Sequence, residues 1–208
     1  EDILQSFAGR REPEKSTSRT IYRHGHIPRE ELLPMIDEAM RELENKNIEE
    51  AENKIRLVLI FAPDNIKAMT ILGQIMYFKG RYREAEHIFR RQLHCAPYHA
   101  TAYNNLAAVM TRQKCFSEAL THIDRAAELA PDSPEILINQ AGIMTLNGDY
   151  DRAIQQFAAA AKLLGPLILF VSGDHCFDAI RNRPEFQKII RGARHNVDSF
   201  RREKGLLP

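Results

Sequence analysis

Residues 69–97 read MTILGQIMYFKGRYREAEHIFRRQLHCAP, and the residue types in this stretch return at fixed intervals before and after it. An alanine falls every 34 residues, and a proline keeps the same interval. The alanines are Ala51, Ala85, Ala119 and Ala153, and the prolines are Pro63, Pro97 and Pro131. A period of this length indicates one supersecondary unit that is stacked repeatedly. Such an array presents an extended surface, so the sequence favours a binding scaffold.

Each period is predicted to contain two helices. In this stretch the first helix carries M-x-x-L-G-x-x-M from Met69 to Met76, and the second carries Y-x-x-A-x-x-x-F from Tyr82 to Phe89. Apolar residues at this spacing share one face of a helix, and small residues let two helices approach closely. Between the two helices, Gly80 and its counterpart Gly148 are expected to adopt a positive φ.

The first-helix pattern returns in the next two periods, as Y-x-x-L-A-x-x-M at Tyr103–Met110 and L-x-x-Q-A-x-x-M at Leu137–Met144. It resembles the tetratricopeptide repeat family, whose signature runs W-x-x-L-G-x-x-Y, then A-x-x-x-F, then P. The resemblance implies an all-α, right-handed superhelical solenoid of antiparallel helix pairs with terminal capping helices. It covers four consecutive repeats, at about 32–65, 66–99, 100–133 and 134–165.

The two ends of the chain depart from the repeat. Residues 1–27 are polar and lack a helical period, which predicts an extended N-terminal arm that packs on the solenoid or on a neighbour. Within residues 28–165, Pro34 predicts that the first helix begins near Leu33. Residues 166–208 are predicted to form a C-terminal capping segment, in which Phe177–Phe186 resembles a segment that often closes bacterial members of the family. Their last helix is predicted to cap the array with a stripe formed by Phe186, Ile189, Ile190, Ala193, Val197 and Phe200.

Composition argues against several other classes of protein. The formal net charge is +1, which gives no overall field for nucleic acid or anionic membrane. No unbroken apolar run approaches the length of a membrane-spanning helix, so we expect no span, although the chain begins at Glu1 and a signal or anchor could have been removed. The cysteines Cys95, Cys115 and Cys176 lack metal or disulfide spacing. Free thiols favour a reducing compartment such as the cytoplasm.

The family resemblance places a partner-binding groove on the inner, concave face, which the first helix of each repeat lines. The inner positions of the fourth repeat also include Gly142 and Thr145. The candidate partner-binding residues are Lys67, Thr70, Gln74, Tyr77, Phe78, Thr101, Asn104, Asn105, Arg112, Glu135 and Asn139.

Two binding modes known in the family can be compared with these residues. Asn105 and Asn139 lie one period apart, where an asparagine ladder could bind a peptide backbone because a carboxamide both donates and accepts hydrogen bonds. The alternative interpretation is a polar groove position without that role. A clamp for C-terminal carboxylates would need cations at inner positions that hold Thr70, Gln74 and Glu135, so we expect no such clamp.

Catalytic and metal sites are poorly supported by the sequence. Asp174, His175 and Cys176 are consecutive, and adjacent residues seldom face one another, so we interpret Cys176 as a turn or buried thiol. His24 and His26 lack further ligands at zinc spacing. We therefore predict no cofactor, no metal and no enzyme activity.

The sequence thus predicts a non-catalytic adaptor that binds an extended peptide or a helix of a partner protein. An alternative is a self-associating module, a homo-oligomer that uses the N-terminal arm or the apolar surface of Leu167–Val171. More distant alternatives are an enzyme and nucleic-acid contact through the basic C-terminal helix, whose cations we interpret as the solvated face of a cap.

Overall fold

The computed structural model describes residues 29–203, and every described element is helical. The predicted N-terminal arm, with His24 and His26, lies outside the described residues. The helices are α2 (Arg29–Glu44), α3 (Ile48–Phe61), α4 (Ile66–Phe78), α5 (Tyr82–Cys95), α6 (Ala100–Arg112), α7 (Phe116–Leu129), α8 (Pro134–Leu146), α9 (Tyr150–Leu164), η3 (Gly165–Leu167), α10 (Ile168–Val171), η4 (His175–Phe177) and α11 (Pro184–Glu203).

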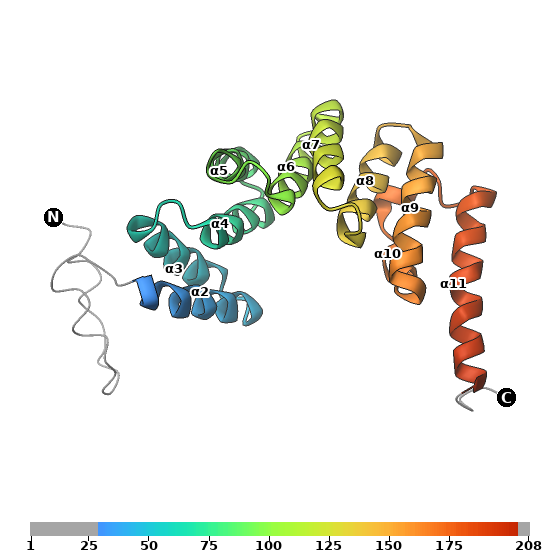
Figure 1. Ribbon diagram of the computed structural model, residues 1–208, viewed down its shortest axis with the longest axis horizontal. Coiled ribbons are helices and arrows are strands. Elements are labelled where there is room, and N and C mark those ends of the chain that lie inside the picture. The colour runs from blue at the N-terminus through green and yellow to red at the C-terminus, as the bar shows by residue number, and fades with distance from the viewer. Residues whose placement is uncertain (1–28, 204–208) are drawn as a thin grey trace.

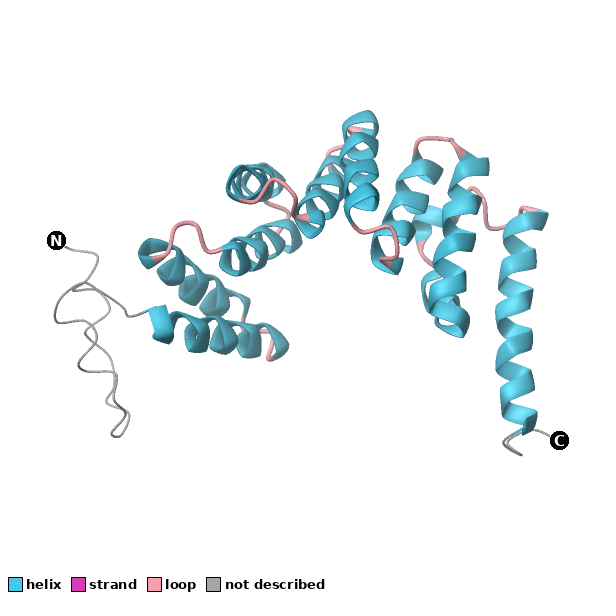
Figure 2. Ribbon diagram, viewed as in Figure 1, coloured by secondary structure: helices cyan, strands magenta, loops and turns pink. Residues whose placement is uncertain are grey.

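The first eight helices form four antiparallel hairpins that follow one another in space. Within each hairpin the two helices pack together, and the second helix of each hairpin also packs against the first helix of the next. The hairpins build an arch that runs from α2 at one end to α11 at the other (Figure 1). Figure 2 shows helices and loops and no strand across residues 29–203. The predicted all-α solenoid of antiparallel helix pairs is confirmed.

The turn inside each hairpin has the same backbone conformation. Gly80 has a φ of 74° and Gly148 a φ of 87°, as the sequence predicted. The equivalent positions of the other two hairpins hold Lys46 and Lys114, whose φ values are 64° and 63°. A residue in the left-handed conformation commonly ends a helix and reverses the chain. Because all four hairpins need the same turn, Lys46 and Lys114 adopt this conformation although it is less favourable for lysine than for glycine.

The first helices of three successive hairpins are capped in the same way. The side chains of Asn65, His99 and Ser133 each accept a hydrogen bond from the backbone N–H three residues further on, at 2.9, 3.2 and 3.5 Å. Such a cap satisfies a donor that the helix leaves unpaired. The caps begin α4, α6 and α8 at equivalent positions, and therefore keep the inner helices in register.

Small residues mark the closest helix contacts. Ala85, Ala119 and Ala153 are fully buried. At Gly73, an added Cβ atom would lie 2.5 Å from the ring of Phe89, which is buried on the facing helix α5. Only glycine therefore fits at this point of the α4–α5 contact. The prediction that a small residue allows two helices to approach closely is confirmed in the second hairpin.

A buried carboxylate joins the first hairpin to the second. Glu52 accepts hydrogen bonds from Arg56 at 2.7 Å and from Lys79 at 2.9 Å, and Arg81 lies at 3.5 Å. Burial alone would raise the pKa of Glu52, but the hydrogen bonds from Lys79 and Arg56 outweigh it and hold the pKa below its ordinary value. The ionised form of Glu52 thus links α3 to the turn between α4 and α5.

The start of the solenoid differs from the prediction. Helix α2 already includes Arg29 and continues through Pro34, so it does not begin near Leu33. A proline inside a helix removes one backbone hydrogen bond, and the packing of buried Leu32 and Ile36 on either side offsets that loss. The exposed Glu38 on the same helix pairs with Lys54 at 3.2 Å.

A second core closes the C-terminal end of the array. Phe157 on α9 packs against Phe177 and Phe186, with ring centroids 4.9 and 4.5 Å away. Both partner rings come from the capping segment, one from η4 and one from α11. The predicted stripe of α11 is buried at Phe186, Ile190 and Ala193, whereas Phe200 is 57% exposed. The stripe was extended too far, because α11 continues past the end of α9 (Figure 1).

One helical stretch is long and apolar enough to cross a membrane by length and composition. It spans Tyr150–Val171, has 22 residues and reaches a mean hydropathy of 1.6. It was not evident from unbroken apolar runs, because Lys162 and two glutamines interrupt them; the absence of a membrane span stays a prediction. One stretch of this kind is weak evidence for a span, since core helices meet the same criteria. Here Ala153 and Phe157 are buried in the second core.

Candidate peptide-binding groove

The first helices of consecutive hairpins lie next to one another. Helix α6 contacts both α4 and α8, and these three helices carry all the predicted groove residues. The predicted residues differ in how far solvent reaches them. Those exposed are Lys67, Gln74, Phe78, Thr101, Arg112 and Glu135, those half-buried are Thr70, Tyr77, Asn105 and Asn139, and Asn104 is buried.

Three aromatic rings and one guanidinium meet where α4 and α6 approach. The ring of Tyr77 makes edge contacts with Phe78 and Tyr82, at centroid distances of 5.6 and 5.7 Å. Arg112 donates from Nε to the Tyr82 hydroxyl at 3.0 Å, and its guanidinium lies 5.6 Å from that ring centroid. We call these four residues the aromatic–arginine cluster. The sequence analysis missed Tyr82 because it lies on α5, a second helix.

The surroundings of this cluster raise the pKa of Tyr77 and keep its hydroxyl group protonated. Burial raises the pKa of Tyr77, and the nearby Asp174 carboxylate raises it further, whereas Arg112 acts in the opposite direction. The hydrogen bond to Tyr82 raises the pKa of Arg112. Among residues 29–203, no carboxylate forms an ion pair with Arg112. The cluster therefore presents a fixed positive charge beside aromatic surface.

The asparagines of the inner face have different surroundings. Asn139 donates to Asn104 Oδ1 at 2.8 Å, and Asn104 donates to Glu135 at 3.1 Å. Asn105 is half-buried, and its Nδ2 atom is buried without a hydrogen-bond partner in the described part of the chain. An unsatisfied buried donor costs free energy. The asparagine ladder of Asn105 and Asn139 stays a prediction.

Two other predicted groove residues already have partners within the chain. Thr70 accepts a hydrogen bond from Gln92 at 2.6 Å and donates to the Ile66 carbonyl at 3.0 Å, so it helps to join α4 to α5. Lys67 pairs with Asp37 at 3.1 Å, which links α4 to α2. These contacts give both side chains a structural role in addition to any role in binding.

The capping segment covers the inner face of the fourth hairpin. Helix η4 packs on α8, and the Cys176 sulfur lies 3.0 Å from the point where a Cβ atom on Gly142 would stand. Thr145 is buried as well. The sequence analysis placed these two inner positions in an open groove, which is wrong because residues 166–183 have no repeat period that would reveal where they fold. The open inner face therefore lies over α4 and α6.

The reactive side chains of this segment do not form a catalytic group. Burial, with the neighbouring Asp174 charge, raises the pKa of the Cys176 thiol to about 12, so the thiol is protonated at neutral pH and a poor nucleophile. Asp174 accepts a hydrogen bond from the Cys176 N–H at 3.0 Å, and that bond contributes most to lowering its pKa. Among residues 29–203, no three His, Cys, Asp or Glu side chains are grouped to hold a metal ion.

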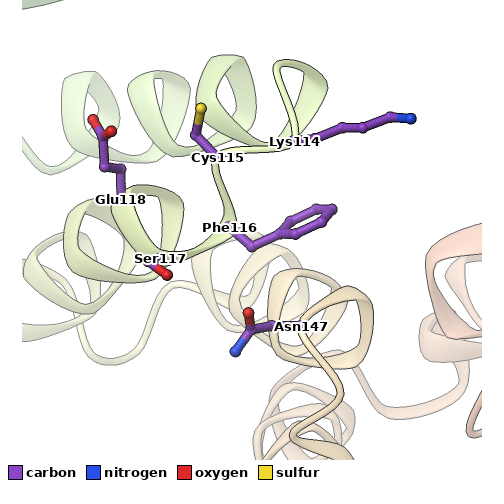
Figure 3. Close-up of a pocket in the computed structure, with 6 residues that line it drawn as sticks. All are labelled: Lys114, Cys115, Phe116, Ser117, Glu118 and Asn147. Carbon is purple, nitrogen blue, oxygen red and sulfur yellow. The ribbon is translucent and has the colours of Figure 1, made fainter.

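A hollow of about 290 Å³ lies on another part of the surface, between the α6–α7 turn and the end of α8. Its lining includes Lys114, Phe116 and Asn147. Figure 3 shows that these side chains point in different directions instead of converging on one point. A small-molecule site needs a few convergent polar groups, so this hollow does not define one.

Comparison with known proteins shows which proteins share this architecture. Residues 98–164 match the family model described as tetratricopeptide repeat. No curated protein matches the chain. Among solved structures, MamA from Desulfovibrio magneticus RS-1 superposes with a TM-score of 0.63 at 16% identity, over 83% of this chain and 96% of that chain. YrrB, a protein described as having an unusual peptide-binding site, gives a TM-score of 0.56 at 21% identity, over 78% of this chain and 84% of that chain.

A third similar structure belongs to an enzyme. The Thermobaculum terrenum O-GlcNAc transferase variant K341M gives a TM-score of 0.63 at 21% identity, over 67% of this chain but only 28% of that one. Identities at this level show a shared fold and carry no activity across. The fold and the inner helix face define an α-solenoid of helix hairpins. Residues 98–164 match the tetratricopeptide-repeat family, and the described helices as a whole have the fold of tetratricopeptide-repeat solenoids.

Proposed function

We propose that the protein is a non-catalytic adaptor that binds an extended peptide segment of a partner protein on the inner face of α4 and α6. Tetratricopeptide-repeat proteins generally mediate protein–protein interactions, and YrrB, which shares the fold, is described as having a peptide-binding site. The observation that carries the proposal is the aromatic–arginine cluster, where exposed aromatic surface lies beside a cation without an ion-pair partner in residues 29–203.

The remaining polar groups of this face suit a peptide backbone. The exposed Gln74 and the half-buried Asn139 carry carboxamides, which can both donate and accept hydrogen bonds. An extended peptide presents both kinds of group along its length. A folded partner surface would present fewer of them, because its backbone groups are mostly paired internally.

The proposal predicts a loss of binding when groove residues are changed together. Peptides selected from a random display library on the full chain should bind the combined variant Tyr77→Leu, Asn105→Ala and Asn139→Ala at least about tenfold more weakly. Fluorescence anisotropy of the labelled peptides measures this change. A matched control changes three exposed residues of the second helices, Arg83→Ala, Thr121→Ala and Gln155→Ala. Equal affinity for the groove variant, with an unchanged melting curve, would contradict a binding groove at this face.

A second candidate function, self-association, is favoured by an apolar surface at the C-terminal end. Leu163, Leu167 and Phe170 follow one another at helical spacing, and Phe170 is 85% exposed. If this surface pairs two copies, sedimentation velocity should show a concentration-dependent dimer that Leu167→Ser with Phe170→Ser abolishes. A concentration-independent monomer, both for the full chain and after removal of residues 1–27, would contradict self-association.

A further inference from the structure

From the contacts of the aromatic–arginine cluster, we infer that the groove takes an acidic peptide segment in which a carboxylate lies close to a large apolar side chain. The inference rests on the proposed function and names the chemistry of its partner. The carboxylate would meet the guanidinium of Arg112, and the apolar side chain would cover Phe78 and the ring of Tyr77. Each half of this recognition follows from a separate feature of the cluster.

The apolar half follows from the exposure of Phe78. Its side chain is 79% exposed although it packs its ring edge-to-face with Tyr77. The two rings therefore form an apolar surface at the C-terminal end of α4, next to half-buried Tyr82. An apolar side chain of a ligand would remove this surface from water, and aromatic rings are the groups that dominate such contacts.

The charged half follows from the unused hydrogen-bonding capacity of Arg112. Its Nε atom donates to the Tyr82 hydroxyl, and its guanidinium lies over that ring, 5.6 Å from the centroid. Neither terminal nitrogen donates a hydrogen bond within residues 29–203, and a planar guanidinium can bind a carboxylate with two parallel hydrogen bonds.

Other cations around the same face are already neutralised. Lys67 pairs with Asp37, and Lys79 pairs with Glu49 and Glu52. A carboxylate that approached either lysine would compete with an existing partner. At Arg112 it would meet no competitor among residues 29–203. Of these three cations, Arg112 is therefore the one whose charge is left for an acidic group.

The surroundings also determine how the acidic group is oriented. The Asp174 carboxylate acts on Tyr77 from the capping segment, and its own hydrogen bond from Cys176 keeps it in place. A second carboxylate near Tyr77 would be repelled, whereas one at Arg112 would be attracted. The ligand acid is thus assigned to the Arg112 side of the cluster and its apolar neighbour to the Phe78 side.

The position of Asn105 gives the expected spacing. Asn105 and Arg112 are seven residues apart on α6, so they lie on one face about 10 Å apart along the helix axis. An extended chain advances about 3.3 Å per residue. A peptide whose carboxylate meets Arg112 and that runs along α6 would therefore pass Asn105 about three residues away. This arrangement differs from the carboxylate clamp considered above, which would use other inner positions.

The test uses the full chain and peptides enriched from a random display library. The best binder is synthesised in two forms, one with its Glu or Asp residues and one with the Gln or Asn isosteres. We expect the acidic form to bind about tenfold more tightly, with a preference that weakens as salt is added. In Arg112→Gln the preference should disappear, and in Arg112→Lys, which keeps the charge without the planar fork, it should be reduced. The matched control is Arg152→Gln, an exposed arginine of α9 paired with Asp149, which should keep the full preference.

The outcomes separate this inference from the proposed function. Equal binding of the acidic and amide forms, enrichment of basic peptides, or a preference that survives in Arg112→Gln would each overturn the inference. If such peptides still lose affinity in the combined variant of Tyr77, Asn105 and Asn139, the groove function stands while its acidic partner is rejected. If they bind that variant as tightly as the unchanged chain, the groove function fails as well.

Discussion

Phe177→Ala is expected to lower the free energy of unfolding by about 3–5 kcal/mol, because it removes a fully buried ring from the centre of the second core. Phe157 and Phe186 would both lose an aromatic neighbour, at centroid distances of 4.9 and 6.0 Å. Because Phe177 contacts rings of both α9 and α11, the docking of α11 on α9 should weaken first. Denaturant unfolding followed by circular dichroism measures the change, and hydrogen exchange locates it.

The matched control for this prediction is Phe170→Ala. That ring belongs to the same end of the molecule but is 85% exposed, so its removal should change the free energy of unfolding by less than about 0.5 kcal/mol. If Phe177→Ala lowered the free energy of unfolding as little as this control does, the packing of Phe177 against α9 and α11 would be wrong. The covering of Gly142 by Cys176 would then fail with it, since both residues belong to the same segment.

Phe89→Ala is the second large expected effect, also about 3–5 kcal/mol of unfolding free energy. Phe89 is buried where α5 meets α4, and its ring lies where a side chain on Gly73 would have to go. Gly73→Ala alone should destabilise the protein by about 1–3 kcal/mol through overpacking against that ring. Thermal and denaturant unfolding of the two single variants give both values.

The double variant Gly73→Ala with Phe89→Ala provides the sharper test. Once the ring is gone, the added methyl group no longer clashes and instead fills part of the cavity. The double variant should therefore lose less free energy of unfolding than the sum of the two single variants. The difference should be about 0.5–3 kcal/mol, as expected for residues in direct contact. Strict additivity would mean that Gly73 and Phe89 do not touch, and would place the helices of the second hairpin in a different register.

Much of the fold could be predicted because its rules act over short distances. The 34-residue period, the small residues at helix contacts and the glycines of the turns each reflect a local requirement of one hairpin. The second helix of the first hairpin, Ile48–Phe61, begins and ends where the sequence analysis placed it. Pro34 led to a wrong prediction of where the first helix begins. Proline disfavours a helix interior locally, but the sequence does not show that the packing of Leu32 and Ile36 offsets this loss.

The candidate site was harder to predict, because its key contacts join residues about one repeat apart. Arg112 meets Tyr82 across 30 residues, and Asn139 meets Asn104 across 35 residues. A period shows that two positions are equivalent, but it does not show which neighbouring side chain each one contacts. The groove assignments of Gln74, Thr101 and the other inner residues remain predictions that the binding experiments address.

The sequence alone determined that this chain forms stacked helix hairpins. Hydrophobic spacing and small residues suffice for that, because each hairpin has the same local packing problem to solve. The family resemblance, and not this pattern, assigned the inner face to the first helix of each hairpin. Only the tertiary structure decided which part of the inner face stays open. The non-periodic segment at Asp174–Phe177 folds back over α8, held by the buried ring of Phe177, and leaves Arg112 and its aromatic neighbours uncovered. This contact depends on how the C-terminal segment packs against the folded repeats. A repeating sequence pattern cannot predict it, because the segment itself does not repeat.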